Sequence, residues 1–188
     1  GNAGSLDNRI EKLNALEKLD INILIIAWRG YSSNPGKPTE AGLYKDVDAA
    51  IKWLISKNIF EQNIILYGES LGTAAAIHIG QNKKFAGIIL EAPFTSMIDM
   101  GQKYYPIFPI KFLLKDKYES KKKIKNLISP LLVMHGKKDS IVPFYMGENI
   151  FNLAKNPKYK YFTDYDDHMM DFNQNLLKSI ENFIQSLN

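Results

Sequence analysis

The feature that most constrains this chain is a short apolar run that ends in Gly-x-Ser-x-Gly and continues into an alanine-rich stretch. The run covers residues 64–67, the motif is Gly68-Glu69-Ser70-Leu71-Gly72, and alanines follow at 74–76. This order predicts a strand, a sharp turn that holds Ser70 in a strained conformation, and a helix that leaves at once. A Cβ at Gly68 or Gly72 is expected to strike neighbouring backbone. The motif alone is weak, but its strand and helix context makes Ser70 a candidate nucleophile.

The composition suits one domain with a hydrophobic core, because the 188 residues are 45% hydrophobic. The chain has no cysteine, which excludes disulfides, thiolate metal sites and a cysteine nucleophile. No metal-ligand spacing, phosphate loop or dinucleotide fingerprint is present, so the sequence predicts no metal and no cofactor. No segment approaches the ~20 apolar residues of a transmembrane helix.

The net charge of +4 comes from lysine, which is densest in residues 115–125. This run has two interpretations: a solvated helix face, or a patch for an anionic membrane surface or anionic substrate. Basic and aromatic residues are not interleaved as in nucleic-acid-binding modules, so no nucleic-acid partner is predicted.

Apolar strand patterns alternate with helical periodicity along the whole chain. Strands are expected at residues 21–27, 63–67, 86–91, 131–134 and 159–163, and helices at 5–19, 39–56, 71–81, 143–154 and 170–187. The pattern predicts an α/β fold, a parallel sheet of about five strands with helices on both faces. Residues 21–27 are apolar almost throughout, as in a strand covered on both faces. Residues 94–125 are less regular and suggest a small lid within a single domain, residues 1–188.

Three residue types needed for nucleophilic catalysis follow three of the predicted strands. Ser70, Asp139 and His168 occur in that order, at the strand ends where chemistry sits in such sheets. A serine hydroxyl needs a base, histidine titrates near neutrality, and a buried acid fixes the imidazole tautomer. Asp166 or Asp167 could orient His168 instead, although both lie beside it in sequence and are poorly placed to reach its ring.

The backbone N–H of Leu71, the residue after the nucleophile, is the first candidate oxyanion donor. His135 ends a predicted strand and is expected to support the acid loop, and His78 is expected to be structural. Glu69 flanks Ser70 and could touch substrate or the base. The aromatic residues of the lid, Tyr104, Tyr105, Phe108 and Phe112, suit either core and lid packing or substrate binding.

At this point the chain resembles the α/β-hydrolase superfamily, specifically the Bem46-like branch near the α/β-hydrolase domain-containing types 13 and 17. The matching runs are residues 1–4, 29–31, 38–44, 68–72, 91–96 and 135–143, together with His168. The resemblance implies that Ser70 is the nucleophile, Asp139 the acid and His168 the base. It also implies that the N–H of Asn2 is the second oxyanion donor, with Ala3 as the fallback. Tyr31, Tyr104 and Phe108 are the candidate substrate-binding residues.

The sequence departs from this family in two places. The family usually has Arg-Gly-Tyr-Gly, whereas here Tyr31 is followed by Ser32. The family's first three strands, which precede the oxyanion loop, are absent, and the third of them lies between the strands expected at 21–27 and 63–67. We therefore expect an N-terminally truncated sheet and a fragment of a longer protein. Either a gap lies beside the nucleophile strand, or the 21–27 strand closes onto it.

The leading hypothesis is a serine hydrolase that cleaves carboxylic esters or thioesters through an acyl-enzyme. A serine peptidase-like hydrolase and a catalytically inactive α/β-hydrolase-like binding module are the alternatives. The expected substrate is a small-molecule or acyl ester or thioester, a membrane surface is a further candidate partner, and the oligomeric state is left open. The expected location is cytoplasmic, or membrane-associated through an N-terminal segment that this sequence does not contain.

Overall fold

The core of the protein is a parallel sheet whose four strands lie side by side in the order of the sequence. The computed structural model describes residues 6–31 and 33–187. The strands are β1 (Ile65–Glu69), β2 (Gly87–Glu91), β3 (Leu131–Gly136) and β4 (Lys158–Thr163). All three pairings are parallel, and the register places Glu69 opposite Glu91. The carboxyl ends of these strands therefore meet at one edge of the sheet.

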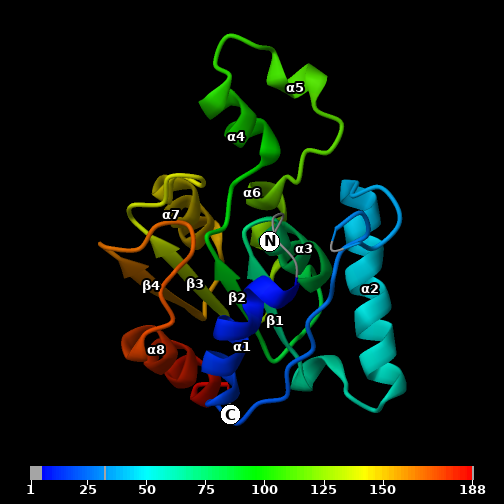
Figure 1. Ribbon diagram of the computed structural model, residues 1–188, viewed down its shortest axis with the longest axis vertical. Coiled ribbons are helices and arrows are strands. Elements are labelled where there is room, and N and C mark those ends of the chain that lie inside the picture. Colours follow the sequence, from blue (N-terminus) through cyan, green and yellow to red (C-terminus); the bar gives the residue numbers. More distant parts are fainter. Residues whose placement is uncertain (1–5, 32, 188) are drawn as a thin grey trace.

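Helices cover both faces of this sheet, as the alternating pattern predicts. One face is covered by α2 (Glu40–Ser56), α3 (Leu71–Gly80) and α7 (Phe144–Leu153), the other by α1 (Ile10–Glu17) and α8 (Gln174–Gln185) (Figure 1). Neighbouring strand residues point to opposite faces: Ile88 packs in the core under α2 and α3, and Ile89 in the core under α1 and α8. Single helical turns at Leu6–Arg9 and Glu61–Asn63 precede α1 and β1.

The prediction of a strand at residues 21–27 is wrong. These residues form no strand, and Ile21, Ile23, Leu24 and Ile25 are exposed. The segment neither joins the sheet nor closes onto β1, which pairs with β2 alone among the described strands. Apolar residues on both faces favour a strand only where two neighbours and two helical layers enclose it. The sheet thus has four strands in the described ranges, one fewer than expected.

The predicted boundaries of the other elements agree with the structure to within a few residues, except that α8 begins at Gln174 rather than near residue 170. Thr39 is the N-cap of α2, and its hydroxyl accepts a hydrogen bond from the N–H of Gly42 at 3.2 Å. Within the described part of the chain, no helix has both the length and the apolarity to cross a membrane.

The expected lid segment, residues 94–125, divides into two parts with different surroundings. Residues 97–118, which we call the lid, contain α4 (Met97–Tyr104) and α5 (Ile110–Leu113) and stand away from the sheet (Figure 1). The turns that follow, α6 (Ser120–Lys123) and Ile124–Asn126, return to the body of the protein, where Ile124 is buried in the core. The protruding part is therefore shorter than the sequence suggests.

Candidate active site

Ser70 lies in the sharp turn between β1 and α3, with φ 50° and ψ −116°. A non-glycine residue rarely adopts this conformation, so the backbone is strained here. A Cβ added to Gly68 would lie 2.6 Å from the carbonyl oxygen of Gly72, which explains why a glycine precedes the turn. The sequence also predicted that a Cβ at Gly72 would strike neighbouring backbone, and this prediction is wrong. An added Cβ there would meet only the Trp28 ring, at an ordinary 3.8 Å.

The side chains of Ser70, His168 and Asp139 form one chain of hydrogen bonds. His168 Nε2 lies 3.1 Å from Ser70 Oγ, and His168 Nδ1 lies 2.9 Å from Asp139 Oδ2. An ionised carboxylate only accepts hydrogen bonds, so His168 Nδ1 carries the proton and donates a hydrogen bond to Asp139. In the neutral imidazole, Nε2 is then free to accept the proton of the serine hydroxyl. The structure thus brings together the three residues that the sequence singled out from three separate strand ends.

Asp139 is buried and all its hydrogen-bond partners are donors. Its Oδ1 accepts the backbone N–H groups of Ile141 and Val142 at 2.9 and 2.7 Å, and its Oδ2 accepts from two histidines. Burial raises the pKa of Asp139, but the hydrogen bonds from His135, His168 and Val142 outweigh burial and hold the pKa well below its ordinary value. Asp139 is therefore ionised across the physiological pH range.

His135 supports the acid, as its position at the end of β3 suggested. It is fully buried, and its Nε2 lies 3.0 Å from Asp139 Oδ2 and 3.0 Å from the carbonyl oxygen of Val142. A Cβ on Gly147 would lie 2.0 Å from His135 Nδ1, so the backbone of α7 presses against this ring. The remaining histidine, His78, stacks on Tyr44 with ring centroids 3.7 Å apart, in agreement with a structural role.

Asp166 and Asp167, the alternative partners of His168, have other contacts. Asp166 accepts a hydrogen bond from the Thr163 hydroxyl at 2.8 Å. Asp167 Oδ1 accepts the backbone N–H groups of Ser140 at 2.8 Å and His168 at 2.7 Å. These bonds lower the pKa of Asp167 and join the acid loop to the base loop. Asp167 thus holds the backbone that carries His168, which the sequence reasoning did not foresee.

The expected oxyanion donors are only partly within the described residues. Leu71 is the first residue of α3, so its N–H has no carbonyl acceptor within the helix and lies at the positive end of the helix dipole. Asn2 and Ala3, the candidates for the second donor, lie outside the described residues.

The three candidate substrate-binding residues lie in different surroundings. Tyr31 packs against the core cluster that contains Leu71, so it is close to the elbow. The Tyr104 hydroxyl donates to the carbonyl oxygens of Ile141 at 2.6 Å and Ser140 at 3.1 Å, directly after Asp139 in the chain. Phe108 is exposed in the lid and contacts Tyr105 edge to face. No described contact links Phe108 to the Ser70–His168–Asp139 chain, and the substrate-binding roles of all three residues stay predictions.

Beside the elbow, a buried cluster of charges links α1 to the sheet. Lys12 forms ion pairs with Glu69 and with Glu91, the latter at 2.7 Å, and Arg9 pairs with Glu69 at 2.6 Å. The Tyr67 hydroxyl donates to Glu91, whose other carboxylate oxygen is buried without a described partner. Burial raises the pKa of Glu69, but the charges of Lys12 and Arg9 outweigh it and lower the pKa.

This cluster was not predicted from the sequence. In this structure Glu69 contacts Lys12 of α1 and Arg9, the residue directly before α1. The available signal was that two buried strands each end in glutamate, but only the register of β1 and β2 places these carboxylates side by side. In the described ranges, no group of three or more histidine, aspartate and glutamate side chains is arranged to hold a metal ion.

Comparison with known proteins identifies the family. The sequence model of the prolyl oligopeptidase family matches residues 37–184. An uncharacterized protein of Mycobacterium tuberculosis is 38% identical over 159 residues, which cover 84% of this chain and 57% of that protein. The human α/β-hydrolase domain-containing protein 17B is 32% identical over 145 residues, 74% of this chain and 48% of that protein. The chain thus spans about half the length of these curated relatives.

Solved structures with the same fold include hydrolases of lipids and esters. The Paleococcus ferrophilus monoacylglycerol lipase superposes with a TM-score of 0.76 at 16% identity, over 100% of this chain and 92% of that chain. The Pyrococcus furiosus esterase Pf2001 superposes with a TM-score of 0.74 at 19% identity, over 94% and 76%. The chain therefore belongs to the prolyl oligopeptidase family, within the α/β-hydrolase-domain branch of the α/β-hydrolase superfamily.

Proposed function

We propose that this α/β-hydrolase is a serine hydrolase that cleaves carboxylic esters or thioesters through an acyl-enzyme, with Ser70, His168 and Asp139 as its catalytic triad. The observation that carries the proposal is the continuous chain of hydrogen bonds, 3.1 Å from Ser70 Oγ to His168 Nε2 and 2.9 Å from His168 Nδ1 to Asp139 Oδ2. Such geometry lets the base take the serine proton as the hydroxyl attacks.

The reaction follows from the roles of these atoms. Ser70 Oγ attacks the substrate carbonyl carbon while His168 Nε2 takes the serine proton, giving a tetrahedral intermediate. His168 returns that proton to the departing alkoxide or thiolate, and the acyl group stays on Ser70. Water then attacks the acyl-enzyme with its proton passing to His168, which returns that proton to Ser70 Oγ as the acyl–oxygen bond breaks and the carboxylic acid leaves. Asp139 stabilises the imidazolium that forms in both halves of the reaction.

The negative oxygen of the tetrahedral intermediate needs preorganised donors. The N–H of Leu71 is one proposed donor and the N–H of Asn2 the other, with Ala3 as the fallback, each donor contributing about 3 kcal/mol in the transition state. The helix dipole of α3 adds a favourable partial charge at the same position.

The names of the relatives support hydrolysis of two bond types. The solved neighbours named above are a monoacylglycerol lipase and an esterase, which favours ester hydrolysis for this chain. The family match favours peptide hydrolysis as a second candidate, because the family is named for a peptidase. The catalytically inactive binding module is less favoured, since its serine and histidine need not lie within hydrogen-bond distance of each other.

A fluorophosphonate probe tests the nucleophile directly. We expect the purified protein to be labelled, and labelling to be lost in Ser70→Ala but kept in Ser56→Ala, a variant of an exposed serine at the end of α2. Asp139→Asn should lower kcat by about 10⁴-fold. Absence of labelling, or labelling that survives Ser70→Ala, would refute the proposal.

A substrate panel then separates the candidate reactions. Aryl esters and acyl thioesters should show a burst of the first product that equals the enzyme concentration if deacylation is slow. Peptide substrates cleaved faster than either would replace esterase by peptidase. A protein that folds but hydrolyses none of the three would favour the binding module.

A further inference from the structure

We propose that the tip of the lid binds the surface of membranes that contain anionic lipids. The lid tip, residues 105–113, presents a group of large apolar side chains to solvent. Ile107 is 93% exposed and Phe112 is 84% exposed, and Tyr105, Phe108 and Leu113 are exposed beside them. Scattered exposed apolar residues are ordinary, but a contiguous group of this size marks an interaction surface.

The lid tip is held in this outward arrangement by bonds within the lid. The N–H of Tyr105 donates to the carbonyl of Gly101 at 2.7 Å, and the N–H of Leu114 donates to the carbonyl of Ile110 at 3.0 Å. Ile110 is buried, and a Cβ on Gly101 would lie 2.6 Å from its Cγ2, so α4 and α5 pack closely. These backbone groups are thus bonded within the lid, which lowers the free-energy cost of moving the tip into a lipid interface.

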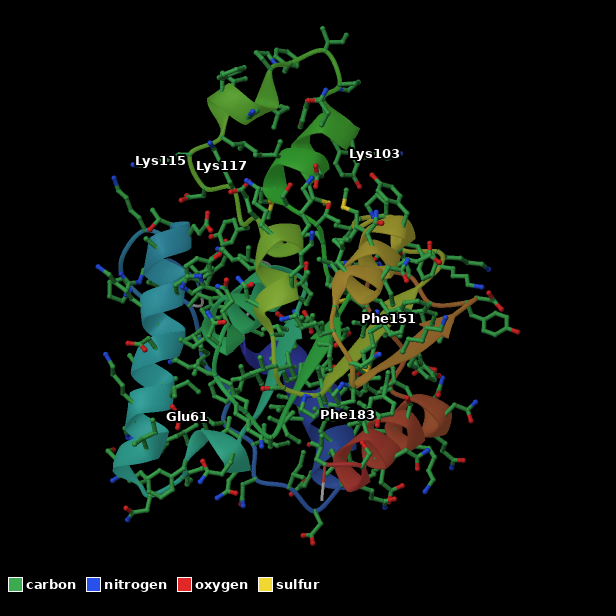
Figure 2. The ribbon with its side chains drawn as sticks, turned by 180° about the vertical axis from the view of Figure 1, so that it is seen from behind. Glu61, Lys103, Lys115, Lys117, Phe151 and Phe183 are labelled. Atoms are coloured by element: carbon green, nitrogen blue, oxygen red, sulfur yellow. The ribbon has the colours of Figure 1, made fainter. Side chains whose placement is uncertain are left out.

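Lysines lie within this apolar tip and on both flanks of the lid below it. Lys103, Lys111 and Lys115 are exposed, and Figure 2 shows Lys103 on one side of the lid with Lys115 and Lys117 on the other. Residues 100–115 contain no aspartate or glutamate. No described acidic residue forms an ion pair with any of these four lysines. Apolar anchors flanked by lysines are the composition that binds anionic membrane surfaces.

The structure shows that only part of the lysine-rich run at residues 115–125 is available as a basic surface. Within the run at residues 115–125, Lys121 pairs with Asp99, Lys122 with Glu119 and Lys123 with Glu40. The charges of these three lysines of α6 are therefore compensated by neighbouring carboxylates. Lys115 and Lys117 of this run have no described acidic partner, and they lie in the lid together with Lys103 and Lys111.

Charge also decides between a membrane and a second copy of this chain as the occupant. A symmetric dimer through the lid tip would bring the lysines of both copies together, and like charges at an interface oppose association. An anionic lipid surface complements the same lysines while its acyl chains receive the apolar side chains. The lid is also bonded through Tyr104 to the carbonyls of Ser140 and Ile141, beside Asp139. Membrane binding at the tip would therefore hold the Ser70 site close to the lipid surface.

Vesicle flotation tests the surface binding without using catalysis. We expect the purified protein to float with phosphatidylcholine vesicles that contain about one-third phosphatidylserine, and this binding to weaken as salt screens the lysines. Ile107→Ser and Phe112→Ser should each weaken binding about tenfold. Lys103→Gln, Lys111→Gln and Lys115→Gln should each weaken it about fivefold. Trp53→Ser and Lys125→Gln, which alter exposed residues outside the lid, are the matched controls and should bind as the parent does.

A fluorescent label reports whether the tip enters the interface. The chain has no cysteine, so Ile107→Cys can carry an environment-sensitive dye, and Trp53→Cys provides the control position. We expect a blue shift on adding anionic vesicles for the dye at 107 and none for the dye at 53. A dye at 107 that does not respond, or binding that survives Ile107→Ser together with Phe112→Ser, would overturn the proposal.

The same measurements distinguish membrane binding from dimerisation, and surface binding from hydrolysis. Sedimentation that shows a dimer abolished by the tip variants, with no vesicle binding, would replace the membrane by a second copy. Ser70→Ala should bind vesicles as the parent does, so lost probe labelling with retained flotation refutes only the hydrolase. Lost flotation with retained labelling refutes only the membrane surface.

Discussion

His135 and His168 bind the same carboxylate oxygen from two sides: His135 Nε2 lies 3.0 Å and His168 Nδ1 2.9 Å from Asp139 Oδ2. One histidine belongs to the proposed triad, and the other is buried with no route to a substrate. This sharing makes the charge and position of Asp139 depend on a residue that does not itself react.

Replacing His135 should therefore impair catalysis through Asp139. His135→Leu removes a hydrogen bond to a charged group, so we expect kcat for an ester to fall about tenfold to a hundredfold, with little change in KM. His135→Gln keeps a donor and should retain more activity. The distinguishing readout is the unfolding free energy as a function of pH, because loss of this donor raises the pKa of Asp139. Equal kcat values for the two variants would argue against this positioning role.

Asp139 should also make the protein sensitive to acid. Its pKa is depressed in the folded state, because hydrogen bonds from His135, His168 and Val142 outweigh the effect of burial. A depressed pKa contributes stability that is present above the unfolded pKa, about 4, and is lost as pH falls through the folded pKa. The parent and Asp139→Asn differ in unfolding free energy, and we expect this difference to depend on pH. It should be about 2 to 3 kcal/mol larger at pH 7 than at the most acidic pH of the titration series. Urea titrations that give parallel curves would contradict this.

The two glycines of the elbow should respond in opposite ways to alanine. Gly68→Ala places a Cβ 2.6 Å from the carbonyl oxygen of Gly72, and neither backbone can move without distorting the turn. We expect a loss of about 2 kcal/mol or more and loss of probe labelling. Gly72→Ala, in α3, meets only the Trp28 ring at an ordinary 3.8 Å and should raise stability by up to about 1 kcal/mol. Thermal unfolding of the two variants measures both effects. Similar melting temperatures would show that the turn relieves the contact between the added Cβ at position 68 and the carbonyl oxygen of Gly72.

The buried charge cluster predicts strong coupling between Lys12 and Glu91. Lys12→Met leaves Glu69 and Glu91 without their shared cation and should lower the unfolding free energy by about 3 kcal/mol. Glu69 keeps its ion pair with Arg9 in that variant, so Glu91 is the carboxylate that loses its cation, and adding Glu91→Gln should restore part of the loss. A double-mutant cycle in urea gives the coupling energy, and strictly additive effects would show that the pairs contribute little.

The elements that agree with the structure are mostly those whose sequence signals lie in adjacent residues. The elbow, α2 with its Thr39 cap, and strands β1 to β4 were predicted because the chain carries their periodicity and end signals in adjacent residues. The strand at residues 21–27 was predicted from the same kind of signal and is absent. The clearance at Gly72 was also misjudged, because the room around a glycine depends on how the helix leaves the turn.

The sequence by itself determined the identity and order of the proposed triad, since Ser70, Asp139 and His168 each follow a recognisable strand. It also determined the α/β alternation, because hydrophobic periodicity is written in neighbouring residues. Only the tertiary structure decided that His135 shares Asp139 Oδ2, that Lys12 joins Glu69 to Glu91, and that lysines without a described acidic partner lie on both flanks of the lid. These contacts connect residues whose spacing in the chain carries no period, so they follow from packing and strand register alone.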